Sequence, residues 1–153
     1  MSLITPSVIK KAVSGKRVLV DTNIIIYLTD SIPSYDGLSR LLFEMIEKGD
    51  VSAVISVISI AEVMQGTLRK GLIRSTMDVK NYLLNFPNAY CQEITAEVLG
   101  HIGLDSAIQW SKLRTPDSLI IASGLANDVD LFISNDQHFK KAISKKSILT
   151  FDM

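Results

Sequence analysis

The chain has 153 residues, of which 47% are hydrophobic and 21% charged, and its 16 basic side chains balance its 16 acidic ones. This length suits one domain with a core large enough to fold alone, and the composition is that of a globular protein. The even charge balance excludes a strongly basic nucleic-acid-binding domain. Any contact with nucleic acid must therefore come from local patches or from a bound cation.

No part of the sequence indicates a membrane span or an exported protein. The longest uninterrupted apolar run, residues 24–28, is far shorter than the roughly 18 residues that a membrane span needs. Residues 1–17 lack the ordered basic, apolar and small-residue zones of a secretory signal. The single cysteine, Cys91, excludes an intramolecular disulfide and is expected as a small buried thiol in a strand. We expect a soluble cytoplasmic protein.

Apolar periodicity and stop signals predict strands alternating with helices. The predicted strands are rich in β-branched residues and lie at 18–20, 51–55, 89–94, 130–134 and 147–151. The predicted helices lie at 3–13, 36–49, 59–71, 72–86, 95–111, 116–127 and 139–143. Gly49 and Gly71 end two of these helices, and Pro87 ends a third. This alternation predicts an α/β fold with three layers, α/β/α, around a mostly parallel central sheet.

Four carboxylates stand in the same kind of place in this pattern: Asp21, Glu62, Asp117 and Asp136. Three follow predicted strands, and all four fall at or near the start of a predicted helix. In a parallel sheet these features meet at one edge, beyond the carboxyl ends of the strands, which is where such folds bind ligands. We therefore expect the four acids to lie near one another.

Helix capping offers a structural explanation for each acid taken singly. Asp21 precedes a helix, and "SIAE" has the form of a capping box with Ser59 at the N-cap and Glu62 reaching back. In "TPD", Thr115 would be the N-cap, with Asp117 in the acid-favouring first turn, and "SND" fits a simple turn. Capping explains why the acids occur, but it does not explain why they should converge.

Convergence would require a cation or protonation. Two carboxylates about 5 Å apart repel each other by roughly 3 kcal/mol at an effective dielectric constant of about 20. Oxygen ligands without clustered cysteine or histidine suit Mg²⁺ or Mn²⁺ and argue against zinc. His101 is expected on a helix surface and His138 in a polar turn, and we assign neither a chemical role.

The segments "VLVDTNIIIYL", "ISVISIAEVMQG" and "LRTPDSLIIASGLANDVDLFISND", with the "HF" that follows, resemble the successive motifs of PIN-domain ribonucleases. The subgroup that the chain resembles most is the VapC-type toxins of toxin–antitoxin pairs. The resemblance runs from Arg17 to Phe139 and implies one PIN-like domain over residues 1–153, with a motif-bearing core at 17–139. Residues 1–16 depart from the family pattern as an N-terminal extension whose role the resemblance leaves open.

The resemblance implies a metal-dependent endoribonuclease that hydrolyses RNA phosphodiester bonds and leaves a 5′-phosphate. Its catalytic and metal-binding acids would be Asp21, Glu62, Asp117 and Asp136, supported by Asn23 and Ser134. We favour Asp21 and Asp117 as direct ligands of Mg²⁺ or Mn²⁺. For Asp136, binding directly or through water stays open, and Glu62 acts either through water or as the general base.

The sequence also suggests which residues contact RNA and which contact other proteins, with fewer signals than it offers for the acids. Lys112 and Arg114 are the expected RNA contacts because they precede "TPD"; Arg69, Lys70 and Arg74, and the lysines at 140, 141, 145 and 146, are further basic clusters. By family resemblance we expect a homodimer and a small antitoxin partner. The expected contact surface is on the helices at 58–70 and 72–86, whose apolar residues are Met64, Leu68, Leu72, Ile73 and Met77.

Other protein classes fit the sequence less well. A haloacid-dehalogenase-type enzyme needs a second Asp where this chain has Asn23, and a receiver domain needs an acidic pair at an earlier strand end. No glycine-rich phosphate loop of the Rossmann or P-loop kind occurs. Two alternatives stay open: a PIN nuclease that processes RNA without being a toxin, and a non-catalytic PIN-like module that binds RNA or protein.

Overall fold

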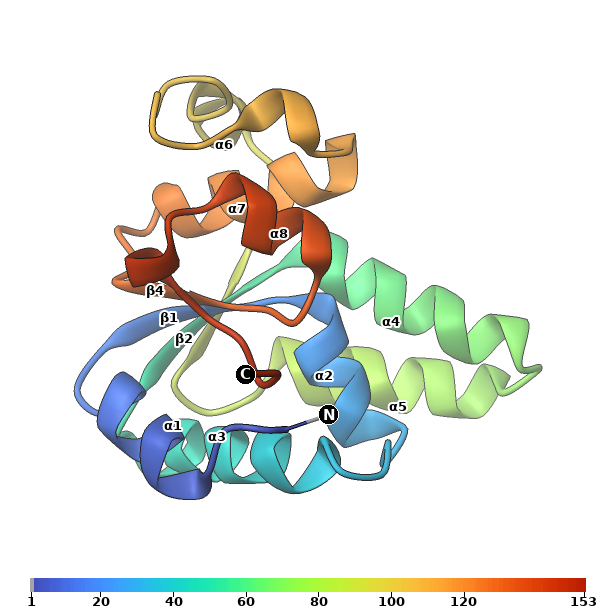
Figure 1. Ribbon diagram of the computed structural model, residues 1–153. Helices are drawn as coiled ribbons and strands as arrows, with labels where there is room; N and C mark the ends of the chain where they lie inside the picture. The colour runs from blue at the N-terminus through green and yellow to red at the C-terminus, as the bar shows by residue number, and fades with distance from the viewer. Residues whose placement is uncertain (1) are drawn as a thin grey trace.

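A computed structural model describes residues 2–153, and its centre is a five-stranded sheet in the order β3-β2-β1-β4-β5 (Figure 1). The strands are β1 (Arg17–Val20), β2 (Ser52–Ser56), β3 (Ala89–Gln92), β4 (Leu131–Ile133) and β5 (Ile148–Leu149). Every neighbouring pair is parallel. The predicted α/β/α architecture with a mostly parallel sheet is confirmed.

Helices cover both faces of this sheet (Figure 1). The longer helices are α1 (Pro6–Val13), α2 (Thr22–Thr29), α3 (Asp36–Lys48), α4 (Val57–Arg69), α5 (Ile73–Leu84) and α7 (Thr115–Leu125). The shorter ones are α6 (Ala96–Gly100), α8 (Gln137–Ala142) and the 3₁₀ turns η1 (Trp110–Lys112) and η2 (Lys145–Ser147). Each βα connection returns the chain to the same end of the sheet, so the loops that follow the strands gather there.

The alternation of side chains along β1 assigns the two layers. Val18 and Val20 point into a core formed with α1 to α5, whereas Leu19 points into a second core formed with α7 and α8. Ile9 and Val13 of α1 are fully buried in the first core, so the N-terminal helix packs as part of the fold.

Gly124 allows α7 to approach the sheet closely. A Cβ atom at this position would lie 2.8 Å from Cε1 of Phe132 and 3.2 Å from Cβ of Leu19, so a larger residue would push the helix outward. Because Asp117 is near the start of the same helix, this contact also helps to set the position of its carboxylate over the sheet edge.

The predicted helix at 95–111 is wrong. Only α6 forms, and the chain then turns at Gly103, whose φ of +84° lies in the left-handed region. Asp105 holds the following turn, since its Oδ1 accepts from the backbone N–H of Ala107 and its carbonyl accepts from the indole N–H of Trp110. These local hydrogen bonds compete with the helix.

Candidate active site

The strand order reverses between β1 and β4, and the first two acids of the site follow these two strands. Asp21 is the N-cap of α2, with its Oδ1 accepting from the backbone N–H of Thr22 at 2.7 Å. Asp136 is the N-cap of α8, with its Oδ1 accepting from the backbone N–H of His138 at 2.6 Å. Capping was therefore a correct explanation for Asp21, while Asp136 caps α8 where the sequence had indicated a simple turn. A cap does not exclude a second role at this topological switch point.

Ser134 links these two acids. Its hydroxyl donates to Oδ2 of Asp21 at 2.6 Å and accepts from the backbone N–H of Asp136 at 3.0 Å. The Ser134 side chain is fully buried. The structure thus places Ser134, for which the resemblance implied a supporting role, in hydrogen-bond contact with Asp21.

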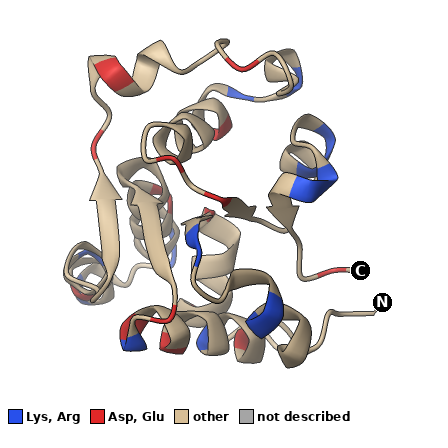
Figure 2. Cartoon of the chain, turned by 90° about the vertical axis from the view of Figure 1, so that its left-hand side faces the viewer, with Lys and Arg blue, Asp and Glu red and all other residues tan. Residues whose placement is uncertain are grey.

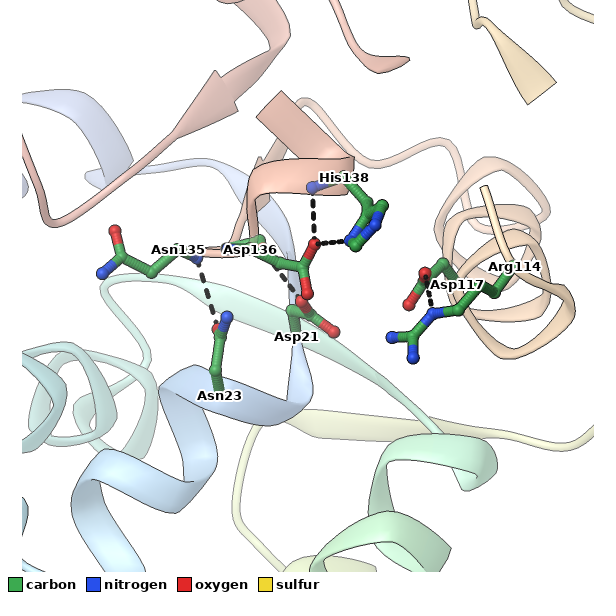
Figure 3. A network of polar contacts seen from close by, with 8 residues as sticks. Asp21, Asn23, Arg114, Asp117, Asn135, Asp136 and His138 are labelled. Atoms are coloured by element: carbon green, nitrogen blue, oxygen red, sulfur yellow. Dashed lines mark hydrogen bonds and ion pairs between the residues drawn. The ribbon is translucent and has the colours of Figure 1, made fainter. Parts of the chain in front are cut away.

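Asn23 contacts the same loop but not an acid. Its Oδ1 accepts from the backbone N–H of Asn135 at 3.3 Å, so it holds the loop between Ser134 and Asp136 (Figure 3). Its support of the acids is therefore indirect.

Asp117 enters the site from α7, on the other side of Asp21 (Figure 3). It is buried, with 5% of its surface exposed, and its Oδ2 is 3.3 Å from Nε of Arg114. Thr115 is not the N-cap that the capping explanation assigned; α7 begins at Thr115, and Arg114 precedes it without a side-chain capping bond. Arg114, predicted as an RNA contact, is paired here with one of the candidate catalytic acids.

Glu62 lies one turn further along its helix than predicted. Ser56, the last residue of β2, caps α4 by accepting from the backbone N–H of Ile58 at 3.2 Å, so the capping box with Ser59 as N-cap does not form. The Thr22 hydroxyl donates to Oε1 of Glu62 at 2.6 Å. This bond ties Glu62 to the residue directly after Asp21.

Asp21 has the most unusual electrostatic environment of the four acids. Burial, together with the smaller effect of the charges of Asp136 and Asp117, raises its pKa from 3.8 to about 7, against the hydrogen bonds from Ser134 and Thr22. Within residues 2–153, no lysine, arginine or histidine forms an ion pair with Asp21. Burial and acidic neighbours destabilise the ionised form of a carboxylate that has no cationic partner, and a positive charge beside it would stabilise that form.

The carboxylate oxygens of the four acids suit a hard divalent cation, but the side chains are not arranged to coordinate one. Among residues 2–153, no group of three or more acidic, histidine or cysteine side chains is arranged so that it could hold a metal ion as the side chains stand. Asp117 is turned to Arg114, and Asp136 to the ring of His138, whose Nδ1 is 3.1 Å from its Oδ1. Each of these two acids is thus engaged by a basic neighbour that a bound cation would replace.

Charged residues are unevenly distributed around the site. Figure 2 shows acidic segments along the centre of the molecule, near the strand ends, and basic segments gathered on the helical region beside the C-terminus. Lys140 and Lys141 lie there, in the last turn of α8. Lys112 is exposed on η1, whereas Lys70 is paired with Asp30 at 2.8 Å.

Arg69 lies closer to the acids than its position in the sequence indicated. It borders a surface hollow of about 330 Å³ together with Glu62 and with Pro116, the neighbour of Asp117. Glu62 and Arg69 lie two turns apart on one side of α4. The sequence predicts that both are in one helix, but it does not show which way that side of the helix faces.

Comparison with known proteins places this arrangement in a family. The family model for the PIN domain matches residues 18–144, which is most of the chain and includes all four acids. The chain belongs to the PIN domain family. The predicted family membership is confirmed. A comparison with curated proteins gave no match.

Solved structures share the PIN fold at low sequence identity. A VapBC complex from Salmonella typhimurium bound to DNA has a TM-score of 0.66 at 16% identity, over 89% of this chain and 98% of that chain. VapBC2 from Rickettsia felis, bound to a promoter DNA fragment, has a TM-score of 0.63 at 18% identity, over 89% and 99%. VapC20 from Mycobacterium tuberculosis, a toxin that cleaves the sarcin–ricin loop, has a TM-score of 0.59 at 13% identity, over 81% and 93%. The predicted likeness to VapC-type toxins is confirmed at the level of the fold.

The site also contains contacts that the sequence did not indicate. His138, to which we assigned no role, touches Asp136, and Thr22 orients Glu62. Thr22 directly follows Asp21, and His138 lies two residues after Asp136. This proximity to a candidate acid is the only local sequence signal for the two contacts. No helix within residues 2–153 has the length and apolarity to cross a bilayer.

Proposed function

We propose that this PIN domain is a metal-dependent endoribonuclease and the toxin of a toxin–antitoxin pair. The observation that carries the proposal is the environment of Asp21, which is buried and lies next to Asp117 and Asp136 at the end of the sheet where parallel sheets bind ligands. Among residues 2–153 it has no cationic partner. Membership of the PIN family and the fold shared with VapC-type toxins support it.

Asp21, Asp117 and Asp136 would hold Mg²⁺ or Mn²⁺, with Glu62 at the border of the site. The ion would supply Lewis-acid activation of the phosphodiester and of a water molecule. Asp21 is fixed by Ser134 and Thr22, so it offers a preorganised oxygen, while Asp117 and Asp136 must turn from Arg114 and His138. Release of Arg114 leaves a guanidinium at the rim, where a phosphate can take the place of the carboxylate.

Glu62 is the candidate general base. Its Oε1 is engaged by Thr22, and within residues 2–153 no hydrogen bond engages Oε2, which is left to accept a proton from water. The hollow that Glu62 borders with Arg69 gives an RNA backbone access to this oxygen.

Cleavage of RNA tests the enzyme. The purified protein should cut RNA with added Mg²⁺ or Mn²⁺, stop with EDTA, and leave 5′-phosphate ends. Asp117→Asn should be inactive, whereas Asp130→Asn, which changes an aspartate at the opposite end of β1, should cleave normally. RNA binding without cleavage in all of these conditions would favour the non-catalytic module instead.

An antitoxin and a second copy are the proposed protein partners. On α4, α5 and the turn between them, Leu68, Leu72, Ile73 and Met77 are 43–70% exposed, which supports a partner surface there, whereas Met64 packs against the core. Sedimentation of the free protein tests the dimer. Toxicity on expression, relieved by a small protein encoded next to it, would separate a toxin from an RNA-processing nuclease.

A further inference from the structure

Asn135 stands between Ser134 and Asp136, and its side chain is fully occupied by the C-terminal segment and its surroundings. Its Oδ1 accepts from the backbone N–H groups of Phe151 at 3.1 Å and Asp152 at 3.0 Å. Its Nδ2 donates to Oδ2 of Asp152 at 2.9 Å and to the hydroxyl of Tyr27 at 3.1 Å. Four hydrogen bonds from one amide fix both the side chain and the backbone that carries it.

Asp152 is the centre of the other half of this network. Its Oδ1 accepts from the hydroxyl of Tyr35 at 2.8 Å, while its Oδ2 holds Asn135. The rings of Tyr27 and Tyr35 are stacked, with centroids 4.3 Å apart and planes 13° apart. The Asp152 carboxylate therefore joins Asn135, in the loop of the candidate site, to Tyr35, whose ring stacks on that of Tyr27.

The N-terminal extension holds the C-terminal segment from outside. The backbone N–H of Ile4 donates to the carbonyl of Phe151 at 2.9 Å, and that of Met153 donates to the carbonyl of Ser2 at 3.1 Å. Leu3 and Asp152 form an antiparallel bridge, and Phe151 is fully buried. The two ends of the chain thus form one layer against the loop.

On its other side, the loop of residues 134–136 contacts acids of the candidate site. Ser134 contacts Asp21 and the backbone N–H of Asp136, as described above. A rotation of the backbone at Asn135 would therefore displace the Ser134 hydroxyl and the Asp136 carboxylate together. Neither the amide of Asn135 nor the carboxylate of Asp152 is hydrogen-bonded to an acid of the site, so their influence acts through the loop.

We propose that Asn135 and Asp152 are positioning residues of the candidate active site. Through their mutual hydrogen bonds, the C-terminal segment holds the 134–136 loop in the orientation in which Ser134 and Asp136 serve a divalent cation. This inference rests in part on the proposed function, because it assumes that the acids bind a cation. It also gives the N-terminal extension a role, as the outer support of the segment that carries Asp152.

The test compares Asp152→Ala with the control Asp130→Ala in the full chain. Both remove an aspartate that accepts hydrogen bonds beside a strand terminus, but Asp130 accepts from the backbone N–H of Arg17, the first residue of β1, at the opposite end of the strands from the candidate site. Three quantities are measured for each variant: hydrogen exchange of the amides of residues 134–136, the affinity for Mn²⁺ by calorimetry, and kcat and KM for RNA.

In Asp152→Ala, the amide hydrogens of residues 134–136 should exchange faster than in wild type, while those of β1 and β2 should exchange at the wild-type rate. Its affinity for Mn²⁺ should fall by roughly tenfold or more, the size typical of residues that orient metal ligands. The loss of activity should fall on kcat and leave KM for RNA near the wild-type value. Asp152→Asn, which keeps one acceptor oxygen, should lie between Asp152→Ala and wild type in all three measurements.

The inference is overturned if folded Asp152→Ala matches Asp130→Ala in loop exchange and in Mn²⁺ affinity. If Asp152→Ala does not fold, Asp152→Asn decides, and wild-type loop exchange in that variant overturns the inference. If wild type binds Mn²⁺ but does not cleave RNA, the proposed function fails, while the exchange and affinity differences still decide the role of Asp152.

Discussion

The hydroxyl of Ser134 donates a 2.6 Å hydrogen bond to Asp21 across 113 residues of sequence. This bond joins the ends of β1 and β4, the two strands between which the sheet order reverses. It stabilises the ionised form of Asp21, yet burial outweighs it and keeps the pKa of that carboxyl near 7. The site therefore holds a carboxylate in place at an electrostatic cost, which a bound cation would remove.

Asp21→Asn should abolish cleavage and raise the stability of the metal-free protein at pH 8. Asparagine caps a helix about as well as aspartate, so α2 keeps its N-cap while the buried charge disappears. Thermal unfolding in EDTA, beside an RNA cleavage assay, measures both effects. A lower melting temperature together with retained cleavage would mean that Asp21 is only a cap.

The stability of the metal-free protein should depend on pH through Asp21. Its pKa is about 7 when folded and 3.8 in its ordinary state, so the folded protein holds this proton more tightly. The resulting stabilisation is complete below about pH 4 and is lost as the pH rises to 7. At about 1.4 kcal/mol for each pKa unit, the loss is of the order of 4 kcal/mol.

The difference in unfolding free energy between wild type and Asp21→Asn isolates this contribution from other titrating groups. The variant should gain on wild type as the pH rises from 4 to 8 in EDTA, and saturating Mg²⁺ should stabilise wild type selectively. A difference that stays constant over this range would show that the Asp21 carboxyl titrates normally.

Thr22→Val should lower kcat by roughly 10- to 100-fold, because a hydrogen bond to a charged group contributes about 1.5–3 kcal/mol. The valine keeps the shape of the side chain and loses the hydroxyl that orients Oε1 of Glu62. Thr22→Ser keeps the hydroxyl and is the matched control, with near wild-type turnover. Equal activity of the two variants would remove Thr22 and the orientation of Glu62 from the mechanism.

The strands and the positions of two acids could be predicted because they depend on local patterns. Runs of β-branched residues form the strands; Asp21 follows β1 directly, and Asp136 follows β4 after two residues. The topology of a parallel sheet predicted that these acids lie near one another. The likeness of the "TPDSLIIASGLANDVDLFISND" segment to the PIN family added the prediction that they serve one catalytic site. Ser134 was anticipated in the same way.

Contacts between side chains far apart in sequence could not be predicted. The bond between Thr22 and Glu62 spans 40 residues, and Asn135 meets Asp152 only because β5 returns beside β4. The pairing of Arg114 with Asp117 is local, but the sequence does not show which way an exposed arginine turns. Arg114, the predicted RNA contact, has an acidic partner in the folded chain that its sequence position does not reveal.

Arg69→Gln should weaken RNA binding and flatten its salt dependence. Arg69 borders the hollow beside Glu62, where a phosphate of the RNA backbone would find an arginine near the acids. Losing one phosphate contact should reduce the log–log salt slope by roughly 0.7 for a single strand. Binding is measured at several salt concentrations with Ca²⁺ in place of the catalytic ion, so that the RNA stays intact.

Lys70→Gln is the control, because it removes the same charge from the adjacent residue. The Lys70 ammonium is paired with Asp30, so its loss should change the salt slope less than the loss of Arg69. Lys112→Gln tests the exposed residue on η1 in the same assay and should resemble Arg69→Gln if the RNA also crosses that rim. Arg114 is unsuitable for charge reversal, since a glutamate there would face Asp117 and disturb the acids themselves. Equal slopes for Arg69→Gln and Lys70→Gln would show that the RNA does not pass through the hollow beside Glu62, and the lysines around α8 would become the next residues to change.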